Sequence, residues 1–138
     1  MDLILAIMMA FASDFNIPVS RDYRIILVPP SEISYEDAMW GRVYPRSVCK
    51  DRKKIYINIE EYNKLSDIKR MGLIYHELGH CALNLRDTVM DKSLMNTDLN
   101  LIEEDGSNWS DLVDELKARY AKNLRMIEKE ALAKQKSK

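Results

Sequence analysis

The sequence predicts one α+β domain spanning residues 1–138, with a small mixed sheet of three or four strands packed on a central helix. Three observations predict this class. Short apolar or alternating segments, bounded by proline and polar residues, fall in the first half of the chain and are typical of strands. Apolar residues then recur at helical spacing over residues 67–85. They do so again over residues 107–135.

The N-terminal segment, residues 2–15, is mostly apolar and predicts a helix that ends near Asn16 and Pro18. Its apolar run, residues 3–12, also fits the hydrophobic part of a secretory signal. A signal carries basic residues before that run, whereas Asp2 is the only charged residue there. We therefore expect a buried first helix, with a signal as the lesser alternative. The run is too short to span a bilayer.

Three segments in the first half predict strands. Residues 24–28 are apolar and are followed by two prolines, as expected for a buried strand that stops there. Residues 41–44 form a weaker candidate. Residues 53–59 alternate and place three isoleucines on one face. The polar residues 46–52 predict a hairpin-like loop between the last two strands.

The central helix is predicted to begin at Ser66, whose hydroxyl can cap it, and Asp67 in its first turn complements the helix dipole. Apolar residues three and four apart mark its buried face: Ile68, Met71, Tyr75, Leu78, Ala82 and Leu85. The sequence His76-Glu77-Leu78-Gly79-His80 lies in this helix, and both histidines fall off the buried face.

This H-E-x-x-H pattern predicts a zinc site. Residues four apart share one helical face, so His76 and His80 can bind one ion at ~2.0–2.1 Å. Glu77 lies too far round the helix to be a ligand, but it can hold a water on the metal and take its proton. The chain has only two histidines and both are in this pattern, so chance is a weak explanation.

Catalytic zinc sites use three protein ligands and a water, so a third ligand is needed. Asp87, seven residues after His80, is the first candidate. Asn84 can adopt the left-handed conformation that commonly ends helices, which would turn the chain back toward the metal. The same segment also offers Asp91, Asp98, Glu103 and Glu104, and the two glutamates are the main alternative to Asp87. The alternative role for Asp87 is a solvated loop residue paired with a nearby basic side chain.

Two further side chains near the motif bear on the site. Met95 lies in the sequence Ser-Leu-Met-Asn, where a tight turn would make it an apolar floor under the histidines. A plain core role fits a lone methionine equally well. Cys81 follows His80 and is an alternative soft ligand, but we favour a small buried thiol on the back of the helix. With only Cys49 besides, we expect no disulfide framework.

Residues 107–135 predict a long C-terminal helix that begins after Ser107 or Asn108 and frays from about residue 134. Its predicted buried stripe consists of Trp109, Val113, Leu116, Tyr120, Leu124 and Ile127.

The stretch HELGHCALNLRD, from His76 to Asp87, is followed by Ser-Leu-Met-Asn at residues 93–96. Together they resemble the small metallopeptidases encoded by tailed phages. These are metzincin-like zincins with an H-E-L-G-H-C-x-L-G-R-x-H stretch and a downstream S-[IL]-M-N turn. The similarity is good over roughly residues 50–100 and loose elsewhere.

The resemblance implies a minimal zincin fold, a zinc ion, Glu77 as general base and Met95 as the methionine of the turn. Two positions depart from the pattern. Asn84 stands in the place of a glycine, which is a tolerable exchange at a left-handed position. Asp87 stands in the place of a third histidine ligand, an exchange that some secreted bacterial zincins also show.

We therefore expect a zinc-dependent peptidase, a hydrolase acting on a peptide or protein, with residues 41–44 as the edge strand to which an extended substrate adds. One alternative is a zinc-binding structural or virion protein without turnover, which the departure at Asp87 favours. Another is a repressor-cleaving zinc peptidase that uses a later glutamate as ligand.

The charge pattern excludes some partners. A formal net charge of −1 and the lack of a basic cluster on one element argue against nucleic acid and against an anionic membrane surface. We expect a location in the host cytoplasm or the virion, with reduced cysteines. The pattern predicts no particular oligomeric state.

Overall fold

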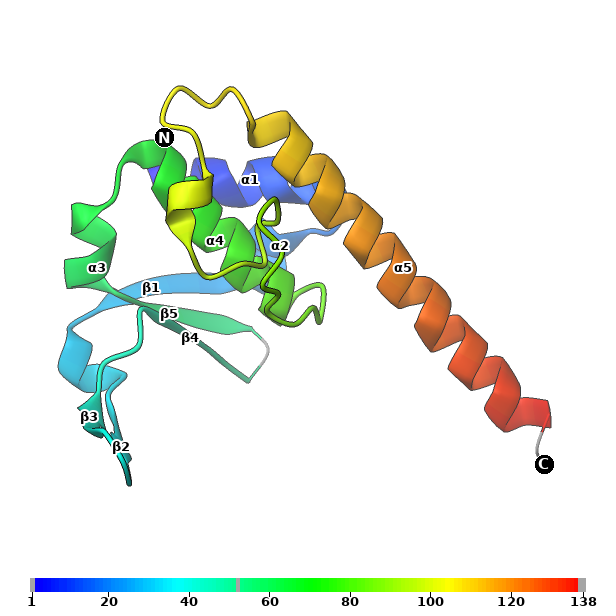
Figure 1. Ribbon diagram of the computed structural model, residues 1–138, viewed down its shortest axis with the longest axis horizontal. Coiled ribbons are helices and arrows are strands. Elements are labelled where there is room, and N and C mark those ends of the chain that lie inside the picture. The colour runs from blue at the N-terminus through cyan, green and yellow to red at the C-terminus, as the bar shows by residue number, and fades with distance from the viewer. Residues whose placement is uncertain (1, 52, 137–138) are drawn as a thin grey trace.

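The computed structural model describes residues 2–51 and 53–136. A small sheet lies on one side of helix α4, and α1 and the start of α5 lie on the other (Figure 1). The elements in chain order are α1 (Leu3–Phe15), α2 (Val19–Asp22), β1 (Arg24–Val28), β2 (Tyr35–Asp37), β3 (Gly41–Val43), β4 (Ser47–Lys50), β5 (Lys54–Asn58), α3 (Ile59–Lys64), α4 (Asp67–Cys81) and α5 (Trp109–Lys136), with 3₁₀ turns at Pro30–Glu32 and Leu99–Leu101. The predicted α+β class, with N-terminal and long C-terminal helices, is confirmed.

The main sheet has three strands in the order β1-β5-β4 and is mixed. β1 runs parallel to β5, and β4 runs antiparallel to it. Ile55 and Ile57 of β5 are fully buried, as the alternation predicts, whereas Ile59 already begins α3. The expectation of a loop over residues 46–52 is wrong, because this segment contains β4. Asp51 has a φ of 58°, so it supplies the left-handed residue that lets β4 fold back onto β5.

The weak strand expected at residues 41–44 exists as β3, but it does not belong to the main sheet. It pairs antiparallel with β2 in a separate hairpin that points away from α4 (Figure 1). The turn of this hairpin is locally stabilised. The Asp37 carboxylate accepts hydrogen bonds from the backbone amides of Met39 and Trp40, and Gly41 has a φ of +74°. The strand therefore folds onto its sequence neighbour instead of onto the sheet.

Helix α1 is the buried first helix that its apolar content predicts. Asp2 caps its N-terminus, and left-handed Asn16 ends it. Phe11, fully buried, packs edge-on against Tyr75 of α4, with ring centroids 5.0 Å apart. The Tyr75 hydroxyl donates a 2.6 Å hydrogen bond to Asp14. In the described part of the chain, every helix is too short or too polar to span a bilayer.

Helix α4 carries the motif and is shorter than expected. Ser66 occupies its N-cap position, but its hydroxyl makes no capping hydrogen bond. The helix ends at Cys81 instead of Leu85. Its predicted core face is confirmed, because Tyr75 and Leu78 are fully buried and Leu85 is buried just beyond the helix end. The opposite face of α4 is turned toward β4 and the loop after the helix.

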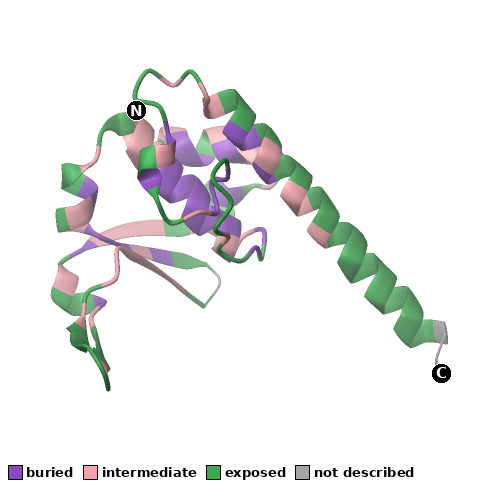
Figure 2. Ribbon diagram, viewed as in Figure 1, coloured by how far each residue is buried: buried purple, intermediate pink, exposed green. Residues whose placement is uncertain are grey.

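Helix α5 begins on the body of the protein and then leaves it (Figure 2). The predicted stripe is buried or partly buried as far as Tyr120, but the prediction is wrong beyond it: Leu124 is 42% exposed and Ile127 is 48% exposed. No other element of the described chain extends far enough to cover them. The tail expected to fray from about residue 134 is helical to Lys136, and residues 137–138 lie outside the described part.

Candidate metal site

Three side chains from α4 and the following loop bring one ligand atom each to a single point. His80 Nε2 lies 3.1 Å from His76 Nε2 and 2.8 Å from Asp87 Oδ1. His76 Nε2 lies 3.0 Å from the same Asp87 oxygen. Within the described residues, this is the one group of three or more metal-binding side chains. The sequence-predicted ligands are therefore together in space.

The local backbone explains how Asp87 reaches the histidines. The helix places the two imidazoles one turn apart, with ring centroids 4.7 Å apart and ring planes at 83°. After the helix, Asn84 has a φ of 56°, the left-handed conformation predicted for it. The Leu85 amide then donates back to the Gly79 carbonyl at 2.9 Å. This reversal returns the chain to the side of α4 that carries the histidines.

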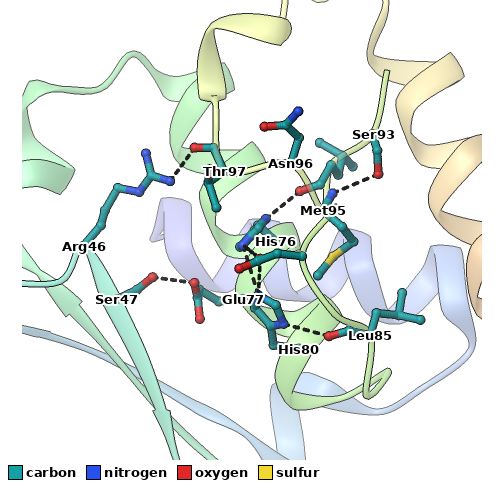
Figure 3. A network of polar contacts seen from close by, with 12 residues as sticks. Arg46, Ser47, His76, Glu77, His80, Leu85, Ser93, Met95, Asn96 and Thr97 are labelled. Atoms are coloured by element: carbon teal, nitrogen blue, oxygen red, sulfur yellow. Dashed lines mark hydrogen bonds and ion pairs between the residues drawn. The ribbon is translucent and has the colours of Figure 1, made fainter. Parts of the chain in front are cut away.

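Backbone carbonyls determine which nitrogen of each ring carries the hydrogen. His76 Nδ1 lies 2.7 Å from the Leu94 carbonyl, and His80 Nδ1 lies 2.7 Å from the Leu85 carbonyl (Figure 3). A carbonyl only accepts, so each Nδ1 must donate a hydrogen. In a neutral ring the Nε2 atom then carries a lone pair. A carbonyl partner of this kind is what metal-binding histidines commonly have.

Two lone pairs and a carboxylate oxygen thus face one another with no hydrogen between them in the neutral state of the rings. Such a group can bind a cation, either a proton or a metal ion. The distances of 2.8–3.1 Å between the donors are close to the about 3.3 Å that separates two ligands of one tetrahedral zinc. Nitrogen and carboxylate ligands are also among those that zinc accepts. The residues present therefore fit a zinc ion.

The Ser-Leu-Met-Asn segment forms the turn expected after the third ligand. The Asn96 amide donates to the Ser93 carbonyl at 3.1 Å, and the Met95 amide donates to the Ser93 hydroxyl at 3.1 Å. Met95 is fully buried directly below Gly79 of the motif, where an added Cβ would overlap the Met95 sulfur. The same turn supplies the Leu94 carbonyl that orients His76. Met95 is therefore part of the support of the site.

Glu77 is buried beside the histidines and contacts the neighbouring strand. The Ser47 hydroxyl of β4 donates a short 2.5 Å hydrogen bond to Glu77 Oε1 (Figure 3). The other carboxylate oxygen has no partner among the described residues. Sequence reasoning missed Ser47, because it placed that residue in a loop. The available signal was a short alternation, in which Ser47 and Cys49 fall on one face of a strand and Val48 and Lys50 on the other.

The two cysteines form a disulfide, so the expectation of reduced thiols and a buried free Cys81 is wrong in this structure. β4 places Ser47 and Cys49 on the face that looks toward α4. Cys81 ends α4, and its Cα lies 6.0 Å from that of Cys49, which is an ordinary separation for a disulfide. The sulfur of Cys81 is engaged there and does not belong to the ligand group.

The alternative ligands lie elsewhere. Glu104 forms an ion pair with Lys69 at 3.0 Å, and hydrogen bonds from Ser66 and Lys69 lower the pKa of its carboxyl group. The Glu103 backbone amide donates a 3.0 Å hydrogen bond to Asn108 Oδ1, and the Glu103 side chain is absent from the ligand group. Asp87 makes no ion pair with a lysine or arginine within the described residues. The structure thus favours Asp87 over Glu103 and Glu104 as the third ligand.

The chain was compared with known proteins. No protein-family model, no curated protein and no solved structure matches it.

The site opens into a pocket of about 350 Å³. The pocket is polar, and its walls come from β4, α4 and the loops around them. Its lining residues are Arg46, Ser47, Val48, Cys49, His76, Glu77, His80, Asp87 and Thr97. Residues 41–44, the expected edge strand of the site, are not among them. β4 takes that place, because it is the end strand of the sheet on this side.

Proposed function

We propose that the protein is a zinc-dependent peptidase that binds its metal through His76, His80 and Asp87. One observation carries the proposal: the carbonyls behind both imidazoles direct two nitrogen lone pairs at a carboxylate oxygen. When bound there, zinc supplies Lewis acidity, which makes a coordinated water more acidic and polarises a carbonyl group.

Glu77 is the proposed general base. It borders the same pocket as the three ligands, and Ser47 holds one of its oxygens in place. The second oxygen is left to accept a proton from the attacking water and then to deliver it to the leaving amine. Ser47 is a positioning residue in this scheme, since it touches the base and not the reacting atoms.

β4 provides the proposed docking edge for an extended peptide. The Asn58 amide donates to the Arg46 carbonyl at 2.9 Å, and Ser47 and Cys49 lie opposite Ile57 and Ile55. Hydrogen-bonded and non-hydrogen-bonded pairs alternate in an antiparallel ladder, so the backbone groups of Ser47 and Cys49 face away from β5. They are available to pair with a substrate strand beside Glu77.

The test is the Glu77→Gln variant, assayed for zinc content and for cleavage of a peptide library. We expect normal zinc loading and a loss of roughly 10²–10⁴-fold in cleavage rate, the usual contribution of a positioned base. Glu60→Gln, on the exposed start of α3, is the matched control and should cleave normally.

Full zinc loading with unchanged proteolysis in Glu77→Gln would refute the base assignment. A wild-type protein that binds zinc and cleaves no peptide of the library would instead support the alternative of a binding or virion component without turnover.

The proposed location remains the host cytoplasm or the virion. Immunodetection in purified particles compared with host lysate separates the two. Alkylation before and after reduction of the same samples shows whether Cys49 and Cys81 are bonded there.

A further inference from the structure

Arg46 occupies the wall between two pockets. It directly precedes β4, and it lines both the pocket of the metal site and a neighbouring pocket of about 400 Å³. Its Nη2 atom donates a 2.6 Å hydrogen bond to the Thr97 carbonyl, in the loop just beyond Met95 (Figure 3). The guanidinium is therefore held in a defined place at the rim of the proposed active site.

The positive charge of Arg46 is not compensated by the protein. A guanidinium carries five N–H donors, and the Thr97 carbonyl is the one acceptor that the described residues give it. Four other arginines of the described chain are paired with a carboxylate. Arg42 pairs with Glu36 at 2.9 Å, and Arg119 pairs with Glu115 at 3.2 Å. Arg46 has no carboxylate within 4.0 Å among the residues that the structure describes.

The neighbouring cations are already paired. Lys69 of the second pocket contacts Glu104 at 3.0 Å, and Lys64 contacts Glu61 at 3.7 Å. The carboxylates of the first pocket are engaged too, because Glu77 accepts from Ser47 and Asp87 contacts the histidines. Across the described lining of both pockets, an unpaired cation thus remains only at Arg46.

We propose that Arg46 binds a carboxylate of the peptide, so that the enzyme selects substrates that carry a carboxylate near the cleaved bond. This inference rests on the proposed function for its setting. A planar guanidinium binds carboxylates through two parallel hydrogen bonds, and the bond to Thr97 restricts its orientation in advance. The carboxylate belongs either to an Asp or Glu side chain near the cleaved bond or to the C-terminus of the peptide. Both sources have the same chemistry.

The experiment measures binding and cleavage separately. Fluorescein-labelled dodecapeptide pools carry a fixed central Glu or a fixed central Gln and an amidated C-terminus, and a third pool has Gln with a free C-terminus. Binding to zinc-loaded Glu77→Gln protein is followed by anisotropy, and cleavage is followed with the wild type. Two pools offer a carboxylate: the Glu pool and the Gln pool with a free C-terminus. We expect one of them to bind about ten-fold more tightly and to be cleaved faster than the amidated Gln pool.

The variants decide whether Arg46 is responsible. Arg46→Gln should remove the difference between the pools, and Arg46→Glu should reverse it toward a pool with a fixed Lys. Arg42→Gln, four residues away on the outward hairpin, is the matched control and should leave the preference unchanged. Thermal unfolding of each variant shows whether it folds, and Arg46→Lys keeps the charge should the others fail to fold.

Each outcome has a definite meaning. Equal losses for all pools in Arg46→Gln would make Arg46 a structural tie to Thr97 and overturn the inference. Cleavage of all pools at one rate would overturn it while leaving the peptidase proposal intact. Arg46-dependent binding without any cleavage would do the reverse: the carboxylate site would stand and the proposed function would fail.

Discussion

Replacing Asp87 by Asn tests the proposed ligand set most economically. The Asp87 side chain is 56% exposed, and its contacts are the two imidazole Nε2 atoms. An exposed substitution away from the core changes stability by about ±0.5 kcal/mol, so the metal-free variant should unfold at nearly the wild-type temperature. The whole effect should therefore appear in the response to zinc.

The size of that effect follows from linkage. Substitution of a residue that only supports a metal ligand lowers metal affinity by about 10–100-fold. We therefore take a loss of about 100-fold in zinc affinity as the minimum for removal of a ligand itself. At a free zinc concentration 100 times the wild-type Kd, zinc stabilises the wild type by about 2.7 kcal/mol. The same concentration stabilises the variant by only about 0.4 kcal/mol. For a domain of this size the difference corresponds to roughly 7–9 °C in Tm.

The assay is differential scanning fluorimetry across a zinc titration, together with metal analysis after dialysis. Asp91→Asn, an exposed aspartate of the same loop, is the matched control and should respond to zinc like the wild type. Glu103→Ala and Glu104→Ala test the alternative ligands. A zinc response that survives Asp87→Asn and disappears in either glutamate variant would refute the assignment.

Three further predictions concern the framework of the site. Gly79→Ala should destabilise the protein by about 1–3 kcal/mol and weaken zinc binding, because its Cβ would overlap the sulfur of Met95; unchanged urea unfolding would contradict this. Replacing Cys49 and Cys81 by Ala should lower the free energy of unfolding by about 3–4 kcal/mol, because the disulfide closes a loop with a sequence separation of 32. Denaturant midpoints measured with and without reductant test this, and the midpoint of the double variant should not change with reductant. Burial and a hydrogen bond to a carboxylate of α1 raise the pKa of Tyr75 above its value in the unfolded chain, about 10. The stability that this provides is complete below pH ~10 and falls above it by up to about 1.4 kcal/mol per pH unit, so the Phe variant should show a flatter decline of Tm in alkali.

The centre of the site was predictable because its information is local. Two histidines four residues apart on an amphipathic helix must share a face. Asn84 is one of the few non-glycine residues that readily adopt a left-handed conformation, and it does so here. The chain reversal that follows left Asp87 within reach of both histidines. Each step needed only neighbouring residues.

The wall opposite the histidines was not predictable in this way. β4 is only four residues long and has one strongly apolar side chain, Val48, and it is a strand because β5 offers it a partner edge. Once β4 is in place, Ser47 meets Glu77 and Cys49 meets Cys81. Both contacts join residues about 30 positions apart, so neither could be derived from local periodicity.

The C-terminal helix shows a different limit. Its apolar periodicity continues through Leu124 and Ile127, and it correctly predicted a helix. Periodicity identifies a face, but it contains no information on how far the rest of the protein extends along that face. The burial therefore stops near Tyr120 although the pattern does not.

The most direct test of the central claim is anomalous diffraction at the zinc absorption edge from crystals of the zinc-loaded protein. The proposal predicts one strong peak within about 2.0–2.2 Å of His76 Nε2, His80 Nε2 and an Asp87 carboxylate oxygen. A peak at other residues, or none while the two imidazoles keep their present carbonyl partners, would contradict it.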